Sequence, residues 1–310
     1  MDLEQLWSRF DANRGQPQPV REPHEGASFS VMQTVPVCYG EATALESLEE
    51  VRPLPISERV VLIGGGRTIE QFDFRRLRHL DATVIGINSG TQYHPCDVLF
   101  YSGSVNGVVA DKACRVNGGV VAQLSNGWAD RPQTVVMPYL FQTGDARNVP
   151  AVTAARELGC ELTTVEYSDL WAWNPHGHEV GFDLFAKAIR KRRLYGAGPD
   201  FGFMACMAAI MHGARELYLV GFDGRFIDGE DEPSVEGLFE AWAGDQTIYA
   251  EAFGGTVTQG QYDFLVTARN EINETLFGWL RAYCAEHGIV LKWLTPSIHA
   301  TRADYKRLKR

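Results

Sequence analysis

The chain of 310 residues lacks the segments that would place it in a membrane or on a secretory route. No apolar run approaches the roughly 20 residues that a transmembrane helix needs. Residues 1–16 are charged and have no apolar centre, which is not the pattern of a secretory signal. These absences predict a cytoplasmic protein with no membrane partner.

Cysteine is sparse and scattered: the six thiols include no C-x-x-C pair. A disulfide scaffold would be denser, and a structural zinc site would cluster its ligands. The closest pair of histidines, His176 and His178, is better explained by a solvent-facing loop. The sequence therefore predicts reduced thiols and no metal site.

An excess of positive charge is also missing. Lys and Arg number 29 against 39 Asp and Glu, which gives a net charge of −10 and argues against a nucleic-acid-binding surface. Hydrophobic residues make up 45% of the chain and charged residues 22%, as in folded globular proteins. Extensive disorder is thereby excluded.

The first 57 residues differ in pattern from the rest. Leu3, Leu6, Trp7 and Phe10 share one face of a short amphipathic helix, after which several prolines interrupt any regular element. We interpret residues 1–57 as an N-terminal arm that packs on the main domain or on a second subunit, so that the protein could form a homo-oligomer.

From residue 58 the chain alternates short, continuous apolar runs with helical segments. Continuous apolar runs are typical of strands buried on both faces of a parallel sheet. The expected strands are 60–63, 83–87, 98–101, 119–122, 134–137, 217–220 and 289–291, and the expected helices are 152–158, 182–191, 203–212 and 264–286. The pattern predicts an α/β fold with a Rossmann-like, mostly parallel sheet sandwiched by helices. Residues 58–300 would form this domain, and 301–310 a basic tail.

A run of three glycines, Gly64, Gly65 and Gly66, directly follows the first strand, and Arg67 and Thr68 come next. Glycines let the chain turn tightly and bring backbone N–H groups close to a bound anion. The run matches neither G-x-G-x-x-G followed by a helix nor a P-loop. It predicts a phosphate site, with a plain glycine turn as the alternative.

Small polar residues follow the next two strands: Asn88 and Ser89 after one, Ser102 after the other. Ligands of open parallel sheets bind beyond the carboxyl ends of the strands, so these side chains are candidates for contacts with a nucleotide. Each could equally cap a turn. Asp223 ends a later buried strand, where a binding or catalytic role would explain a carboxylate and a cap on the turn at Gly224 is the alternative. Gly202 begins a helix of small residues that can pack tightly under the sheet and whose amino end could face the same ligand.

Taken together, these motifs resemble the bacterial sialyltransferases of glycosyltransferase family 42. They also resemble related flagellin glycosyltransferases and hydroxymethylpterin diphosphokinase-like proteins. The matching stretches, which cover about residues 58–300, are 61–69 with 72–77, 87–88, 100–104, 181–185, 202–223 and 289–297. The resemblance implies that Gly64 to Thr68, Asn88, Ser102 and Gly202 line a nucleotide pocket with Asp223 at its edge. It also implies transfer from a nucleotide sugar without a metal.

The chain departs from this family at chemically important positions. The general-base histidine of the family falls near Asn270 or Glu271, where this sequence has no histidine, and Arg225 replaces a tyrosine. A donor of the CMP-sialic acid type therefore does not follow from the resemblance.

The missing base has to be sought elsewhere. Residues 224–262 are irregular, acidic and aromatic, which is typical of a lid over a site. Asp263 or Glu271 on the following helix could deprotonate an acceptor hydroxyl, with His176 or His178 as the rival. Arg67, Arg225 and Arg269 are candidates for contacts with the leaving phosphate. A solvated surface role is the alternative for each.

Three functions fit these observations. The first is a metal-independent glycosyltransferase that takes a nucleotide-sugar donor, with a glycan, a protein or a modified nucleobase as acceptor. The second is a nucleotide-dependent, pterin-type diphosphokinase that would need Mg²⁺ held by acidic residues, such as those between 228 and 232. The third is a non-catalytic nucleotide-binding module.

Overall fold

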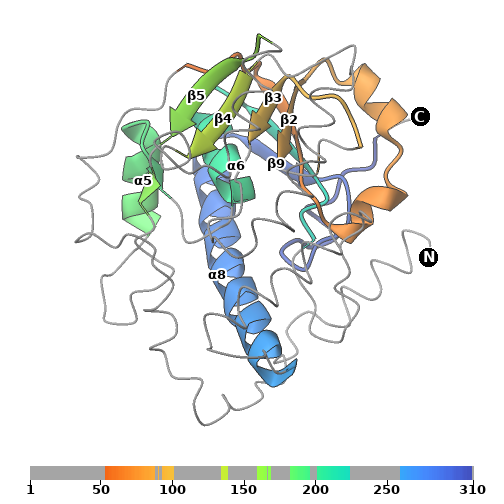
Figure 1. Cartoon of the computed structure of the whole chain (residues 1–310), viewed down its shortest axis with the longest axis vertical. Coiled ribbons are helices and arrows are strands. Elements are labelled where there is room, and N and C mark those ends of the chain that lie inside the picture. The colour runs from red at the N-terminus through yellow and green to blue at the C-terminus, as the bar shows by residue number, and fades with distance from the viewer. Residues whose placement is uncertain are drawn as a thin grey trace.

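The computed structural model describes residues 53–87, 90, 93–100, 134–138, 159–165, 167–168, 182–195, 201–223 and 259–308. Their centre is a seven-stranded sheet in the order β5-β4-β3-β2-β1-β8-β9, in which every neighbouring pair is parallel (Figure 1). The strands are β1 (Arg59–Ile63), β2 (Thr83–Ile87), β3 (Val98–Phe100), β4 (Thr134–Pro138), β5 (Glu161–Val165), β8 (Glu216–Val220) and β9 (Val290–Trp293). The predicted α/β fold with a parallel sheet is confirmed.

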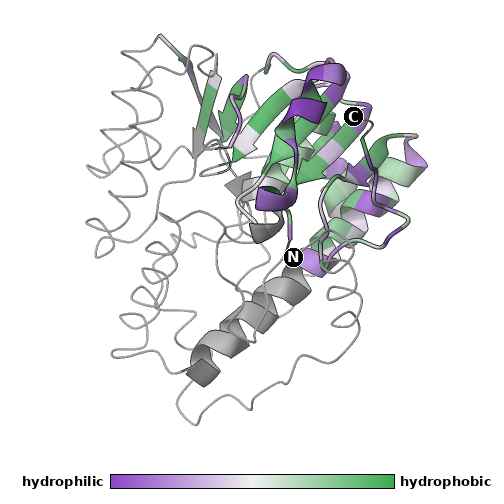
Figure 2. Cartoon of the chain, turned by 90° about the vertical axis from the view of Figure 1, so that its right-hand side faces the viewer, coloured by the Kyte–Doolittle hydropathy of each residue, from purple (hydrophilic) through white to green (hydrophobic). Residues whose placement is uncertain are grey.

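Alternate residues of β1 face two different hydrophobic clusters. Val60 and Leu62 belong to the cluster that contains α5 (Phe182–Arg190), α6 (Phe201–Met211) and α8 (Gln259–Glu286). Val61 and Ile63 belong to the other cluster, with the 3-10 helices η2 (Arg67–Gln71) and η3 (Phe74–His79). The sheet is therefore covered on both faces, which explains why its strands are continuously apolar. Figure 2 shows these hydrophobic strands behind surface turns that carry hydrophilic residues.

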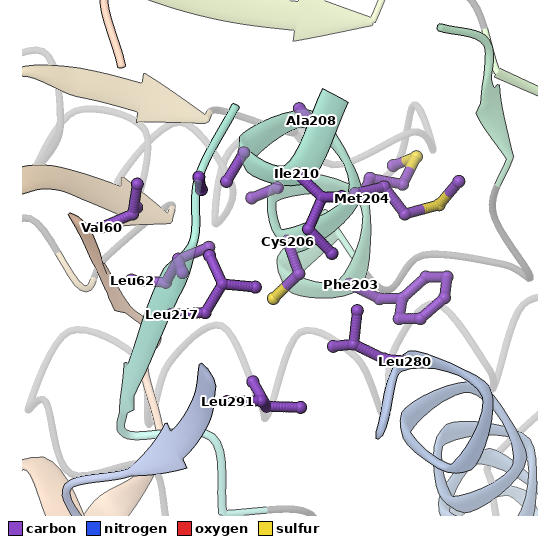
Figure 3. Packing of buried hydrophobic residues seen from close by; sticks show 14 of the residues in the cluster. Val60, Leu62, Phe203, Met204, Cys206, Ala208, Ile210, Leu217, Leu280 and Leu291 are labelled. Atoms are coloured by element: carbon purple, nitrogen blue, oxygen red, sulfur yellow. The ribbon is translucent and has the colours of Figure 1, made fainter. Parts of the chain in front are cut away.

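Helix α6 is apolar on all sides because it is packed on all sides. Residues 202–210 are all buried, and the helix contacts β1, β2 and β3 as well as α5. Figure 3 shows its side chains between Leu62 and Leu217 of the sheet and Leu280 of α8. The tight packing expected from its small residues is thus observed.

Helices α6 and α8 run antiparallel to the strands that follow them. The turn after α6 lies at the amino edge of the sheet, where the Arg215 amide donates to the Glu58 carbonyl at 2.6 Å. The turn after α8 lies at the same edge, since the Val290 amide donates to the Arg215 carbonyl at 2.8 Å. The amino-terminal parts of both helices therefore point toward the carboxyl edge, and Figure 1 shows α8 extending well past the sheet.

Several elements differ from the prediction. Strand β5 and the two-stranded sheet of β6 (Tyr167–Ser168) and β7 (Leu194–Tyr195) were not expected. Helix α8 begins at Gln259, so the last residues of the expected lid, 259–262, are helical. The arm up to residue 52, the expected strand 119–122, the expected helix 152–158 and the lid residues 224–258 lie outside the described residues.

The expected basic tail, 301–310, belongs to the packed domain as far as residue 308. The Trp293 amide donates to the Asp304 carbonyl at 2.9 Å, and the Lys306 amide donates back to the Trp293 carbonyl at 2.8 Å. Leu308 is buried in the cluster of η2 and η3. These contacts place the segment alongside β9.

Gly90, which follows β2, provides a test of how closely the chain packs at the end of β1. A Cβ atom at Gly90 would lie 2.2 Å from the Ile63 carbonyl oxygen and 2.5 Å from that of Gly64. Both neighbours are backbone atoms, so the clash cannot be relieved by a side-chain rotation. We expect Gly90→Ala to lower the free energy of unfolding by about 1–3 kcal/mol, as overpacking does.

The matched control is Gly278→Ala in α8, where an added Cβ would have no atom within 4 Å. Because alanine is the better helix former, this variant should gain roughly 0.5–1 kcal/mol. Urea denaturation measures both changes. Wild-type stability in Gly90→Ala would contradict this packing.

Candidate functional site

The candidate site lies where the chain reverses its direction of travel across the sheet. From β1 the chain proceeds to β2, β3, β4 and β5 on one side, whereas β8 and β9 lie on the other side of β1. In open α/β sheets, ligands bind beyond the carboxyl ends of the strands at such a switch point. The glycine run follows β1, and residues 221–223 follow β8, so both segments meet at this position.

The glycine run is held against the end of β8 by backbone hydrogen bonds. The Gly64 amide donates to the Val220 carbonyl at 2.8 Å, and the Gly66 amide donates to the Gly221 carbonyl at 2.9 Å. A Cβ at Gly64 would lie 2.6 Å from the Gly221 oxygen, and one at Gly66 would lie 2.4 Å from the carboxyl carbon of Asp223. Glycine is therefore required at 64 and 66 by this close approach to β8.

Asp223 caps the 3-10 helix that follows the glycines. Gly66 occupies the N-cap position of η2 and has no side chain to cap it. The Asp223 carboxylate accepts a hydrogen bond from the Thr68 amide at 2.6 Å on one oxygen and from the Thr68 hydroxyl on the other. Both residues are buried. The cap thus comes from a different strand, 155 residues away in sequence.

Burial raises the pKa of the Asp223 carboxyl to about 7, because the charged form loses its hydration. The two hydrogen bonds from Thr68 act in the opposite direction, since they favour the charged form. The loss of hydration is the larger effect. The carboxyl group consequently changes its charge near neutral pH.

The segment after β9 is the third component of the site. The Thr295 hydroxyl accepts a hydrogen bond from the Gly221 amide at 2.9 Å, and the Ile298 amide donates to the Asp223 carbonyl at 2.9 Å. Thr295 and Ser297 are fully buried polar residues. Together these bonds fix the backbone of residues 221–223, which carries the Asp223 side chain.

A histidine–carboxylate pair adjoins this segment and was missed from the sequence. His299 is buried, and its Nδ1 lies 3.0 Å from an Oε atom of the half-exposed Glu274 on α8. Arg281 donates to the other Glu274 oxygen at 3.1 Å and also to the His299 carbonyl oxygen. The hydrogen bond from His299 is the main cause that lowers the pKa of Glu274, with Arg281 adding to it. No local pattern links residues 25 positions apart.

The structure brings together some of the residues expected from the sequence. Gly64, Gly65, Gly66, Thr68 and Asp223 lie at one point of the sheet edge, and Arg67 is part of η2. Gly202 is buried in the first turn of α6, on the carboxyl side of the sheet. Asp263, Arg269 and Glu271 belong to α8, but their side chains lie outside the described part of the chain. The other expected site residues lie wholly outside the described residues: Asn88, Ser89, Ser102, His176, His178 and Arg225.

Among the described residues, no three His, Cys, Asp or Glu side chains gather as a metal-binding group. Within the same residues, no helix is long and apolar enough to span a membrane.

The comparisons with known proteins give structural neighbours only. No protein-family model matches the chain, and no curated protein matches it. The chain is similar to the monofunctional α-2,3-sialyltransferase Cst-I from Campylobacter jejuni, with 13% identity, a TM-score of 0.42 and coverage of 84% of this chain and 85% of that one.

The chain is also similar to the sialyltransferase CstII from Campylobacter jejuni in complex with cytidine-5′-monophosphate. The identity is 15%, the TM-score 0.39, and the coverage 81% of this chain and 85% of the other. Both neighbours are sialyltransferases, the class that the motifs of the sequence resemble.

The raised pKa of Asp223 predicts how stability depends on pH. Between about pH 4 and pH 7 the unfolded chain has lost this proton while the folded chain retains it, so the folded state binds more protons. The contribution of Asp223 to the free energy of unfolding should therefore fall as pH rises through this window and level off above pH 7. Urea denaturation gives the free energy of unfolding of the wild type and of Asp223→Asn at each pH in this window. The wild-type value minus the variant value isolates the contribution of Asp223, because the other titrating groups are the same in both proteins. If this difference rose with pH, the burial of the Asp223 carboxyl would be contradicted.

Proposed function

We propose that the chain is a glycosyltransferase that moves a sugar from a nucleotide-sugar donor to an acceptor hydroxyl without a metal. The observation that carries this proposal is the loop of residues 64–68, held at the switch point by β8 and by the buried Asp223. Open α/β sheets bind ligands at the switch point, and the backbone N–H groups of a glycine turn there can bind a nucleotide phosphate. The sequence motifs that resemble glycosyltransferase family 42 narrow the class of nucleotide ligand to a nucleotide sugar.

The hydrogen bonds of the loop show how its shape is held. The amides of Gly64, Gly66 and Thr68 donate to β8 or to Asp223, so they serve to shape the loop. We propose that the nucleotide phosphate binds along residues 64–68, where the Arg67 side chain could form charge-assisted hydrogen bonds to it. Asn88, Ser89, Ser102, Gly202 and Arg225 would complete the nucleotide pocket.

We propose that Asp223 contributes to turnover through the loop. Both of its carboxylate oxygens accept hydrogen bonds from Thr68, which leaves it engaged in holding η2 against β8. Its role is then to position the phosphate-binding segment, and Thr68 would share that role.

The proton acceptor for the acceptor hydroxyl would lie on or beside α8. Glu274 marks where this helix passes the carboxyl edge, because it contacts His299 after β9. With a rise of about 1.5 Å per residue, Glu271 lies roughly 4.5 Å and Asp263 roughly 16 Å farther along the helix. The backbone positions of both residues suggested by the sequence lie along the part of α8 that extends beyond the carboxyl edge, with Glu271 the nearer to the edge, which supports the proposal.

Nucleotide binding is the first test. A thermal-shift panel of CMP, UDP, GDP and ATP, each with and without Mg²⁺, should show stabilisation by one nucleotide that does not depend on Mg²⁺. A hundredfold excess over Kd corresponds to about 2.7 kcal/mol. Gly65→Val should abolish the shift while the unliganded protein melts normally, since a branched side chain fills the approach to the loop.

The other outcomes of this panel identify the competing functions. Stabilisation only by ATP with Mg²⁺ would favour a diphosphokinase, and binding without transfer of any sugar would favour a non-catalytic module. No shift with any nucleotide would refute the proposal.

The positioning role of Asp223 predicts a matched pair of variants. Asp223→Asn should lose about 10²-fold in kcat/KM, because misplacing the phosphate site misplaces the reacting atoms. Thr68→Val, which removes the partner hydroxyl at similar volume, should lose activity in the same direction. Steady-state kinetics with the donor found in the panel measures both. Full activity in Thr68→Val with a large loss in Asp223→Asn would instead assign Asp223 a direct role in the reaction.

A further inference from the structure

The arrangement of His299 and Glu274 fixes where the imidazole carries its proton. Glu274 lies 3.0 Å from Nδ1, and the hydrogen bonds from His299 and Arg281 lower its pKa. Since an ionised carboxylate can only accept hydrogen bonds, the Nδ1 atom must donate. In the neutral imidazole the other nitrogen, Nε2, then carries a lone pair and acts as a proton acceptor.

The Nε2 atom of His299 is buried and has no hydrogen-bond partner among the residues that the structure describes. Leaving a buried polar atom without a partner costs about 1–3 kcal/mol, and folded proteins rarely retain such atoms. An unpaired acceptor beside an oriented carboxylate is the arrangement of a general base before its substrate binds. The absent partner is therefore best explained as a hydroxyl group of a ligand.

The imidazole ring of His299 is held in place by its neighbours, and it lies at the carboxyl edge of the sheet, where the candidate site is. Phe277 stacks on it with ring centroids 5.3 Å apart, and Arg281 fixes the backbone by donating to the His299 carbonyl oxygen. The preceding residue, Ile298, donates its amide to Asp223, whose carboxylate shapes the glycine loop. The histidine is thus connected directly to the proposed nucleotide site.

We propose that His299 is the general base of the transfer reaction and that Glu274 is its positioning residue. This inference rests on the proposed glycosyltransferase function. The acceptor O–H bond breaks and its proton passes to Nε2, while the acceptor oxygen forms a bond to the anomeric carbon of the donor. The bond from that carbon to the leaving phosphate oxygen breaks, and the phosphate takes the electron pair. The resulting imidazolium is stabilised by the Glu274 carboxylate.

The burial of Nε2 has a consequence for specificity. An acceptor hydroxyl must displace the groups that cover this atom, and water is kept from it until then. The base would therefore be unable to activate water in the absence of the acceptor. Transfer is favoured over hydrolysis of the donor for this reason.

The first experiment does not depend on activity. Long-range ¹H–¹⁵N spectra of the ¹⁵N-histidine-labelled protein report which ring nitrogen is protonated, and His299→Asn identifies the His299 signals. In the neutral ring we expect the proton on Nδ1 in the wild type, and a mixture of the two tautomers in Glu274→Gln. A proton fixed on Nε2 in the wild type would overturn the proposal, because a protonated Nε2 cannot accept the proton of the acceptor hydroxyl.

The second experiment separates catalysis from structure. His299→Asn keeps an amide that can donate to Glu274 but removes Nε2, so it should lose about 10²–10⁴-fold in kcat, the range of general-base catalysis, with the donor Kd unchanged. The matched control is His287→Asn at the amino edge of the sheet, where His287 stacks on Tyr283, and it should keep full activity. Should His299→Asn fail to fold, His299→Gln and the tautomer measurement decide.

The same assay includes variants of Asp263 and Glu271, both in the first half of α8. Loss of transfer in Asp263→Asn or Glu271→Gln together with full activity in His299→Asn would move the base to α8 and overturn the inference alone. Absence of any nucleotide-induced thermal shift in the wild type would instead refute the proposed function. The two failures are therefore distinguishable.

Discussion

The buried carboxylate of Asp223 is the group on which the arrangement of the site depends. A carboxyl group this deeply buried is stable only when hydrogen bonds replace its hydration, and Thr68 supplies two of them. Those bonds hold η2 against the end of β8 and leave no room for a side chain at Gly66. The glycine run and the strand-end aspartate, which look like separate motifs in the sequence, are thus one structural unit.

This unit lies at the switch point because of the order of the strands. β1 and β8 are neighbours, and the strands that follow them, β2 and β9, lie on opposite sides of this pair. The loop after β9 then closes against β8, with Thr295 and Ile298 bound to residues 221–223. Hydrogen bonds therefore join all three loops into one connected unit.

The sequence predicts the elements whose pattern is local. β1, β2 and β8 are continuous apolar runs, and α6 is apolar on every side, so burial on all sides could be inferred directly. β5 was missed because Glu161-Leu162-Thr163-Thr164-Val165 carries few apolar residues, and β6 and β7 because each has two residues. The glycine run follows β1 as the sequence indicated, but the close approach that requires Gly64 and Gly66 is to the residues that follow β8. That contact joins residues about 155 positions apart and has no local signal.

The His299–Glu274 pair could not be predicted from the sequence for the same reason: its two residues are far apart in the chain. The resemblance to glycosyltransferase family 42 implies a general base near Asn270 or Glu271, on the helix, where this chain has only an amide and a carboxylate. Glu274 lies three residues after Glu271, which is one turn of α8 and therefore the same face. A carboxylate on that face can hold an imidazole supplied by another element, and the loop after β9 supplies it. Because α8 and β9 are antiparallel neighbours at the carboxyl edge, residues 25 positions apart meet there. In the proposed reaction, the helix contributes to proton transfer by orienting a base rather than by carrying one.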